Sequence, residues 1–138
     1  MRFKALLFGT LLTLPALGQK IQTIRVAPLV STYPGEQQYA DLITAKLISH
    51  LVGAGVSVVE GASETPTDAV LKVTYMVQTT EDNGFKQYHF QGPVRLTDMN
   101  GKVVWADEIR NNPFAYSASS SFAENIARKV EAFISKQK

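Results

Sequence analysis

The chain has 138 residues, no cysteine and a formal net charge of +2. This length suits one ordinary domain behind a short leader. The excess positive charges are Arg2 and Lys4, and the remaining chain carries 12 basic and 12 acidic residues, a balance that argues against nucleic-acid binding. Without cysteine the fold has no disulfide, so its apolar core must hold it together.

Residues 1–18 are typical of a cleaved secretory signal peptide. Arg2 and Lys4 precede an apolar run from Ala5 to Leu14, and Ala16-Leu17-Gly18 forms a small-x-small cleavage site. The run is about half of the roughly 20 residues that a membrane-spanning helix needs. Because the chain lacks cysteine, it offers no attachment point for a lipoprotein anchor. We therefore predict a periplasmic or secreted protein, without a lipid anchor, whose single domain spans residues 19–138.

The first half of this domain predicts a strand, a helix and two further strands. Ile21 to Leu29 is rich in β-branched residues, as strands are. A helix should run from about Glu36 to Gly53, because apolar residues recur there every four positions. Val56 to Glu60 predicts a short buried strand, and Ala69 to Val77 alternates apolar and polar residues with the period of a strand. Thr79 to Gly84 predicts the turn that follows.

The next two strands form a hairpin around Asn100-Gly101. The first places Tyr88, Phe90, Val94 and Leu96 on one face, and its Gly92-Pro93 pair predicts a bulge or an edge position. A two-residue or a four-residue hairpin loop would put Trp105 on the Leu96 face, whereas a three- or five-residue loop would reverse the faces. We predict that Trp105 faces the core.

The last element is a helix. Ser121 and Glu124 have the spacing of a capping box, and an apolar stripe follows them. The stripe consists of Phe122, Ile126, Val130 and Phe133. The predicted order is therefore β-α-β-β-β-β-α. Its simplest packing is an α+β two-layer sandwich with both helices on one face of a mixed sheet, and a three-layer arrangement is the alternative.

The carboxylates near the second hairpin do not form a recognisable reactive site. Asp98 and Asn100 lack the further oxygen ligands of a calcium loop and are better explained as turn residues. Asp107 and Glu108 are adjacent in a strand, so their side chains should point to opposite faces and not act on one bond.

Other polar motifs give no catalytic, cofactor-binding or metal site. His50 and His89 are isolated, whereas zinc sites usually combine several histidine or cysteine ligands. The serine run from Ser117 to Ser121 precedes a helix and is better explained by capping. Gly53 to Gly55 follows a helix, which is the reverse of the order in phosphate-binding loops. We therefore predict no cofactor and no catalytic residue.

Contact with a partner is the role we predict for four apolar side chains that should be exposed. They are Tyr33, Met76, Phe114 and Tyr116. Exposed apolar side chains that gather on one surface mark protein interaction sites.

Three segments together resemble a bacterial envelope superfamily. They are "IRVAPL" before a helix, "TDAVLKVTY" in mid-chain, and "VRLTDMNGKVVWADE" before a serine-rich approach to the last helix. This arrangement is similar to that of the curli secretion-channel protein CsgG, the penicillin-binding-protein activator LpoB and the N-terminal domain of TolB. The order of elements is also similar to that of the lipopolysaccharide-assembly protein LptE. Many of these relatives are lipoproteins, and this chain lacks the cysteine.

The resemblance implies a non-enzymatic periplasmic adaptor or assembly module that acts through contacts with envelope proteins. Self-association into a homo-oligomer is compatible with this role. One alternative is an accessory protein of lipopolysaccharide assembly or of the outer membrane. A second alternative is a small periplasmic hydrolase that uses Asp107 or Glu108 with a histidine.

Overall fold

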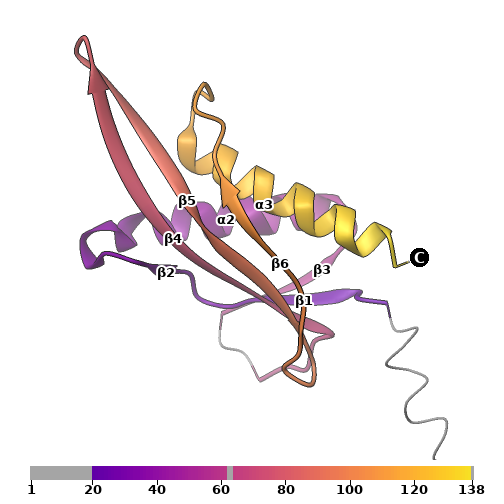
Figure 1. Cartoon of the computed structure of the whole chain (residues 1–138). Coiled ribbons are helices and arrows are strands. Elements are labelled where there is room, and N and C mark those ends of the chain that lie inside the picture. The colour runs from indigo at the N-terminus through magenta and orange to yellow at the C-terminus, as the bar shows by residue number, and fades with distance from the viewer. Residues whose placement is uncertain (1–19, 62–63, 138) are drawn as a thin grey trace, which may run out of the picture.

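The computed structural model describes residues 20–61 and 64–137, so the predicted signal peptide lies outside the described residues. Within these residues, six strands and three helical segments follow one another, and Figure 1 shows their arrangement. In chain order they are β1 (Thr23–Val26), β2 (Val30–Ser31), the 3-10 helix η2 (Pro34–Tyr39), α2 (Ala40–Gly53), β3 (Ser57–Glu60), β4 (Ala69–Asp82), β5 (Phe85–Asp98), β6 (Val103–Arg110) and α3 (Ala118–Ser135).

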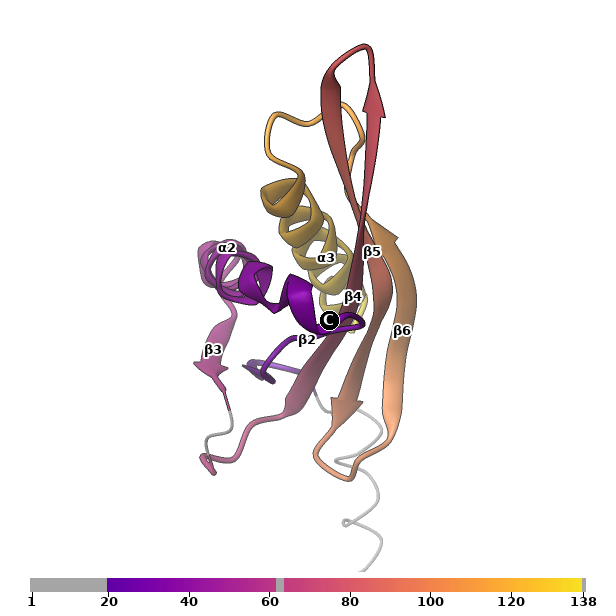
Figure 2. The same cartoon turned by 90° about the vertical axis from the view of Figure 1, so that its left-hand side faces the viewer.

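The strands form one mixed sheet in the order β3-β1-β4-β5-β6, with the short β2 paired to β4. β1 runs parallel to β3 and β4, whereas β4, β5 and β6 are antiparallel neighbours. Both α-helices cover the same face of this sheet (Figure 2). The predicted α+β two-layer sandwich is confirmed, and the three-layer alternative is wrong.

The core lies between the helices and one face of the sheet. Alternate residues of β4 are buried there, as the period of two predicted. They are Ala69, Leu71, Val73, Tyr75 and Val77. The apolar stripe of α3 closes the core from above through Phe122, Ile126 and Val130, none of which is exposed. Burial of such side chains stabilises a fold by about 1.5–3 kcal/mol each.

β4 and β5 extend further than the sequence indicated. The predicted turn at residues 79–84 is wrong in extent, because the two strands stay paired up to Asp82 and Phe85. Only Asn83 and Gly84 turn, with φ angles of 53° and 84°, as a two-residue type I′ hairpin requires. Residues 78–89 therefore form a two-stranded ribbon that projects beyond the body of the sheet (Figure 1). We call these residues the arm.

The loop between β5 and β6 has three residues, not the two or four predicted. The Asp98 amide donates to the Lys102 carbonyl oxygen at 2.8 Å, and Gly101 adopts a φ of 84°. The Asp98 carboxylate accepts hydrogen bonds from the amides of Asn100 and Lys102, both at 2.9 Å. This local hydrogen bonding favours the three-residue loop.

Trp105 nevertheless lies on the predicted face. The register between β5 and β6 shifts by one residue between Leu96 and Thr97, which is a β-bulge. The three-residue loop alone would turn Trp105 away from the Leu96 face of the sheet. The extra residue of the bulge turns it back, so Trp105 pairs with Leu96 and packs against the core. Its ring is half-buried and lies 6.5 Å from the ring of Phe133 in α3.

Gly92 and Pro93 do not form a bulge or an edge. Both lie inside β5, which is bordered by β4 and β6. A Cβ atom on Gly92 would lie 1.9 Å from the carbonyl oxygen of Thr74 in β4. Glycine is therefore required here because the backbone of the neighbouring strand occupies the space of a side chain.

Both helices begin differently from the prediction. Glu36 lies in η2, and the α-helix begins only at Ala40. In α3 the N-cap is Ser117, whose side chain accepts a hydrogen bond from the Ser120 amide. Ser121, the predicted cap, is buried in the first turn of the helix and has another role described below.

Candidate functional site: an exposed aromatic surface

Four aromatic side chains lie exposed at the arm and at the loop that joins β6 to α3. Phe85 and Tyr88 belong to the arm and are 75% and 40% exposed. Phe114 and Tyr116 belong to the loop, and both are almost wholly exposed. The arm and the loop lie side by side and line one open groove of about 370 Å³. We call the four side chains the aromatic surface.

Buried Asn111 fastens the loop to the base of the arm. Its backbone N–H donates to the carbonyl oxygen of Phe90 at 3.1 Å, and its side-chain Oδ1 accepts from the backbone N–H of Phe90 at 2.7 Å. Its Nδ2 donates to the carbonyl oxygens of Tyr88 at 3.3 Å and Asn112 at 3.0 Å. Asn111 thus continues the pairing of β6 with β5 by one residue and then ends it.

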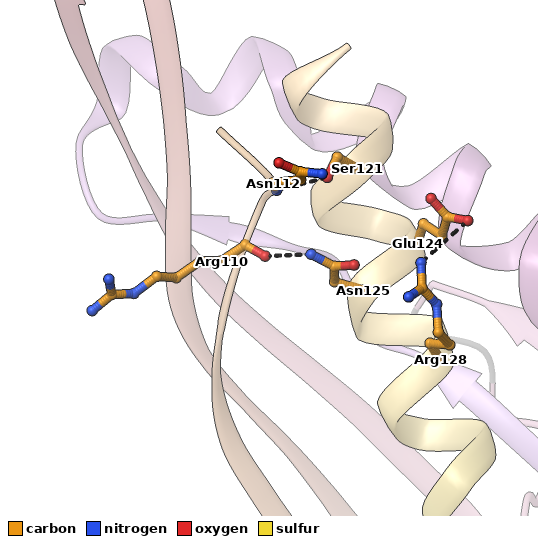
Figure 3. A network of polar contacts seen from close by, with 6 residues as sticks. All are labelled: Arg110, Asn112, Ser121, Glu124, Asn125 and Arg128. Carbon is orange, nitrogen blue, oxygen red and sulfur yellow. Dashed lines mark hydrogen bonds and ion pairs between the residues drawn. The ribbon is translucent and has the colours of Figure 1, made fainter. Parts of the chain in front are cut away.

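Two side chains of α3 hold the same segment from the other side (Figure 3). Asn125 Nδ2 donates to the Arg110 carbonyl oxygen at 2.7 Å, and Ser121 Oγ accepts from the Asn112 amide at 2.8 Å. This bond explains why Ser121 is buried within the helix and does not cap it. The start of the loop is therefore fixed to both the sheet and α3, which holds Phe114 and Tyr116 beside the arm.

A cluster of buried aromatic rings supports the base of the arm. The Phe90 ring stacks on Phe122 with 5.9 Å between centroids and meets the edge of Tyr39 at 5.1 Å. The Tyr75 hydroxyl donates to the Glu36 carbonyl oxygen at 2.8 Å. Burial, with the nearby negative charge of Glu36, raises the pKa of Tyr75 to about 12. Each contact between two aromatic rings of this cluster contributes about 0.5–1.5 kcal/mol to stability beyond the burial of its apolar area.

The structure brings together two of the four predicted contact residues. Phe114 and Tyr116 both line the groove beside the arm. Tyr33 is exposed just before η2, and half-buried Met76 lies on the sheet face that the helices leave uncovered.

Sequence reasoning missed the contribution of the arm to this surface. The sequence pattern predicts Tyr88 on the same face as Phe90 and predicts no role for Phe85. Tyr88 does lie on the same strand face as Phe90, but it belongs to the arm, which extends beyond the body of the sheet. The Asn83-Gly84 pair is a strong signal for a two-residue hairpin and places Phe85 at its tip.

The charged residues considered for catalysis are separated. Asp107 lies on the helix face, where its carboxylate is 3.7 Å from Lys129 Nζ, and Glu108 occupies the next position of β6. His89 Nε2 lies 3.1 Å from Thr80 Oγ1 in the arm, whereas His50 lies in α2. Within residues 20–61 and 64–137, no three metal-ligating side chains cluster.

The chain resembles known proteins in its three-dimensional structure. No protein-family model matches the sequence, and no curated protein does. The PelC dodecamer from Paraburkholderia phytofirmans aligns with 80% of this chain and 85% of that chain, at 18% identity and a TM-score of 0.59. Lipoprotein GNA1162 from Neisseria meningitidis aligns with 83% of this chain and 98% of that chain, at 19% identity and a TM-score of 0.54. A minor lipoprotein from Acinetobacter baumannii aligns with 84% and 92%, at 12% identity and a TM-score of 0.53.

At these identities the likeness shows a common fold. In the described part of the chain, no helix is long and apolar enough to cross a membrane. The chain shares the α+β fold of PelC and of these two bacterial lipoproteins.

Proposed function

We propose that the protein is a non-enzymatic assembly module of the bacterial envelope, periplasmic or secreted, that acts by binding proteins. The aromatic surface carries this proposal. Tyrosine and phenylalanine are enriched at protein interfaces, and tyrosine is among the residues that most often dominate the binding energy. The likeness to the group of CsgG, LpoB and the TolB N-terminal domain supports the same role.

The way the surface is built also supports binding. Exposed aromatic side chains on a flexible loop would be adaptable but costly to order in a complex. Here the hydrogen bonds of Asn111 and Ser121 hold the start of the loop before any partner arrives. A loop whose start is held beside the groove suits a binding surface, because less backbone entropy is lost when a partner binds.

Self-association is part of the proposal. PelC, which has the same fold, is a dodecamer, and a surface used between identical copies is a common solution in oligomers. We infer that copies of this chain also associate. The absence of a lipid anchor stays a prediction that rests on the lack of cysteine.

A pair of double variants tests the proposal. Phe114→Ser with Tyr116→Ser removes two exposed rings and should leave the fold intact, because neither side chain belongs to the core. The control combines Leu42→Ser with Val52→Ser on α2, where both side chains are more than half exposed. The measurements are mass by light scattering and crosslinking in living cells, followed by mass spectrometry.

We expect wild type and control to form the same assemblies and crosslinks to envelope proteins, and the loop variant to lose them. A wild-type monomer without envelope crosslinks would contradict the proposal. Unchanged assemblies and crosslinks in the loop variant would also contradict it, because the aromatic surface would then have no role.

A further inference from the structure

Side chains satisfy the open backbone groups of the sheet where the arm begins. On the β4 side, Glu36 Oε1 accepts a hydrogen bond from the Val77 amide at 3.0 Å. On the β5 side, Asn111 Oδ1 accepts from the Phe90 amide at 2.7 Å. Natural proteins cover strand edges in this way because unpaired amides and carbonyls attract other strands.

Part of the outer edge of β6 is covered as well, at Glu108 and Arg110. Asp107 Oδ1 accepts from the Glu108 amide at 2.8 Å, and Asn125 Nδ2 donates to the Arg110 carbonyl oxygen at 2.7 Å. Lys129 from α3 pairs with the same Asp107 carboxylate. A further strand would have to displace these side chains before it could pair with the Glu108 amide or the Arg110 carbonyl oxygen.

The β5 edge of the arm has no such cover. Backbone groups of alternate residues point to the same side of a strand. Because Phe90 bonds to Asn111 on the β6 side, Tyr88 and Lys86 point their backbone groups to that side too. Among the described residues, the Lys86 amide and carbonyl and the Tyr88 amide have no hydrogen-bond partner there. Thr79 and Glu81 are the matching open positions on the β4 edge.

The β5 edge of the arm faces a groove. The groove lies between the arm and the loop, with the aromatic surface along its walls. Lys86 is the one charged side chain among its lining residues. An edge that offers backbone hydrogen bonds next to apolar walls recognises an extended peptide by strand addition. The single positive charge favours a segment that carries an acidic residue.

We propose that the β5 edge of the arm binds an extended, acidic segment of a partner protein as an added strand. The segment places apolar side chains against the aromatic surface at alternate positions, because side chains alternate along a strand. Its backbone pairs with Lys86 and Tyr88, and the pairing stops at Asn111, which already occupies the next position. The inference rests on the proposed protein-binding function and specifies how the partner is recognised.

Three variants of the full chain separate backbone pairing from charge. Lys86→Pro removes an open amide at the groove, and Glu81→Pro removes the matching amide at the same level of the opposite edge. Both amides point away from the partner strand, so neither change removes a β4–β5 hydrogen bond. Lys86→Gln removes the charge and keeps the amide. Trp105 fluorescence during urea unfolding checks that each variant folds.

The probe is a phage-displayed library of random twelve-residue peptides, selected on the wild-type protein. We expect selected peptides that alternate apolar residues and contain aspartate or glutamate. Lys86→Pro should weaken the synthesised consensus peptide about tenfold or more, Lys86→Gln about threefold, and Glu81→Pro less than twofold. Hydrogen exchange at the Lys86 and Tyr88 amides should slow when the peptide binds.

The inference is overturned if no peptide is selected, or if the consensus peptide binds Lys86→Pro as tightly as wild type. Its failure is distinct from failure of the proposed function. If cells show envelope crosslinks that Lys86→Pro leaves unchanged, only strand addition falls. If the peptides behave as expected but wild type gives neither assemblies nor envelope crosslinks, strand addition stands and the envelope role falls.

Discussion

Replacement of Asn111 by alanine should reveal how strongly the loop is fastened to the arm. The change leaves the Phe90 amide without its 2.7 Å acceptor, and Phe90 is only 2% exposed. A buried donor that loses its partner costs about 1–3 kcal/mol. The two hydrogen bonds that Asn111 Nδ2 donates add about 0.5–1.5 kcal/mol each at most, less where water replaces them. We therefore expect a loss of about 2–4 kcal/mol in the free energy of unfolding.

Urea unfolding followed by Trp105 fluorescence measures this loss. With a slope of about 2 kcal/mol per molar urea, typical of a small domain, the midpoint should fall by about 1–2 M. The control is Asn112→Ala, because Asn112 is exposed and its side chain accepts only from the exposed Phe114 amide at 2.9 Å. That change should cost less than about 1 kcal/mol. The reasoning is refuted if Asn111→Ala costs no more than Asn112→Ala.

Three further predictions concern the core. Trp105→Ala should cost about 2 kcal/mol by urea unfolding followed by circular dichroism, roughly half the loss for a fully buried ring, because the ring is half-buried. Gly92→Ala should cost more than about 3 kcal/mol or prevent folding, since its Cβ would overlap the backbone of β4, whereas Gly53→Ala has free space and should be neutral or slightly stabilising. In an absorbance titration, Tyr75 should ionise near pH 12, because burial and the nearby charge of Glu36 raise its pKa.

The pKa of Tyr75 also predicts how stability depends on pH. The folded pKa is raised above the unfolded value of about 10, so the protonated hydroxyl stabilises the fold fully below pH 10. This contribution should fall as the pH rises from about 10 towards 12. Tyr75→Phe should abolish the late step of the titration. A Tyr75→Phe variant whose titration matches that of wild type above about pH 11 would show that the Tyr75 hydroxyl is not shielded from water.

Much of the fold could be predicted from the sequence because burial imposes a period. The alternation from Ala69 to Val77 and the apolar stripe of α3 both reflect one buried face, and the structure has both. Trp105 was placed correctly even though the loop was wrong, because the bulge in β6 compensates for the loop. The predicted loop length was wrong by one residue and the one-residue bulge was not predicted, and these two errors cancelled. The alternation of apolar and polar residues could reveal neither.

Asn83-Gly84 signals the turn of the arm, but the length of the arm and its support by Asn111 could not be predicted from the sequence pattern. Thr79 to Asp82 are polar and exposed, so no period marks them as a strand. In the sequence Asn111 has no feature that distinguishes it from other loop residues. Its role depends on Phe90 of β5, which lies 21 positions earlier in the chain. The aromatic surface therefore became visible only when the structure placed the arm beside the loop.

Site-specific photocrosslinking tests most directly whether the aromatic surface is the contact site. A photoreactive amino acid replaces Tyr116 in one strain and Leu42 on α2 in another, since both positions are exposed. We predict that irradiation of living cells gives crosslinked species at position 116, to copies of this chain or to envelope proteins, and none at position 42. Crosslinks at position 42 alone, or at neither position, would contradict the account.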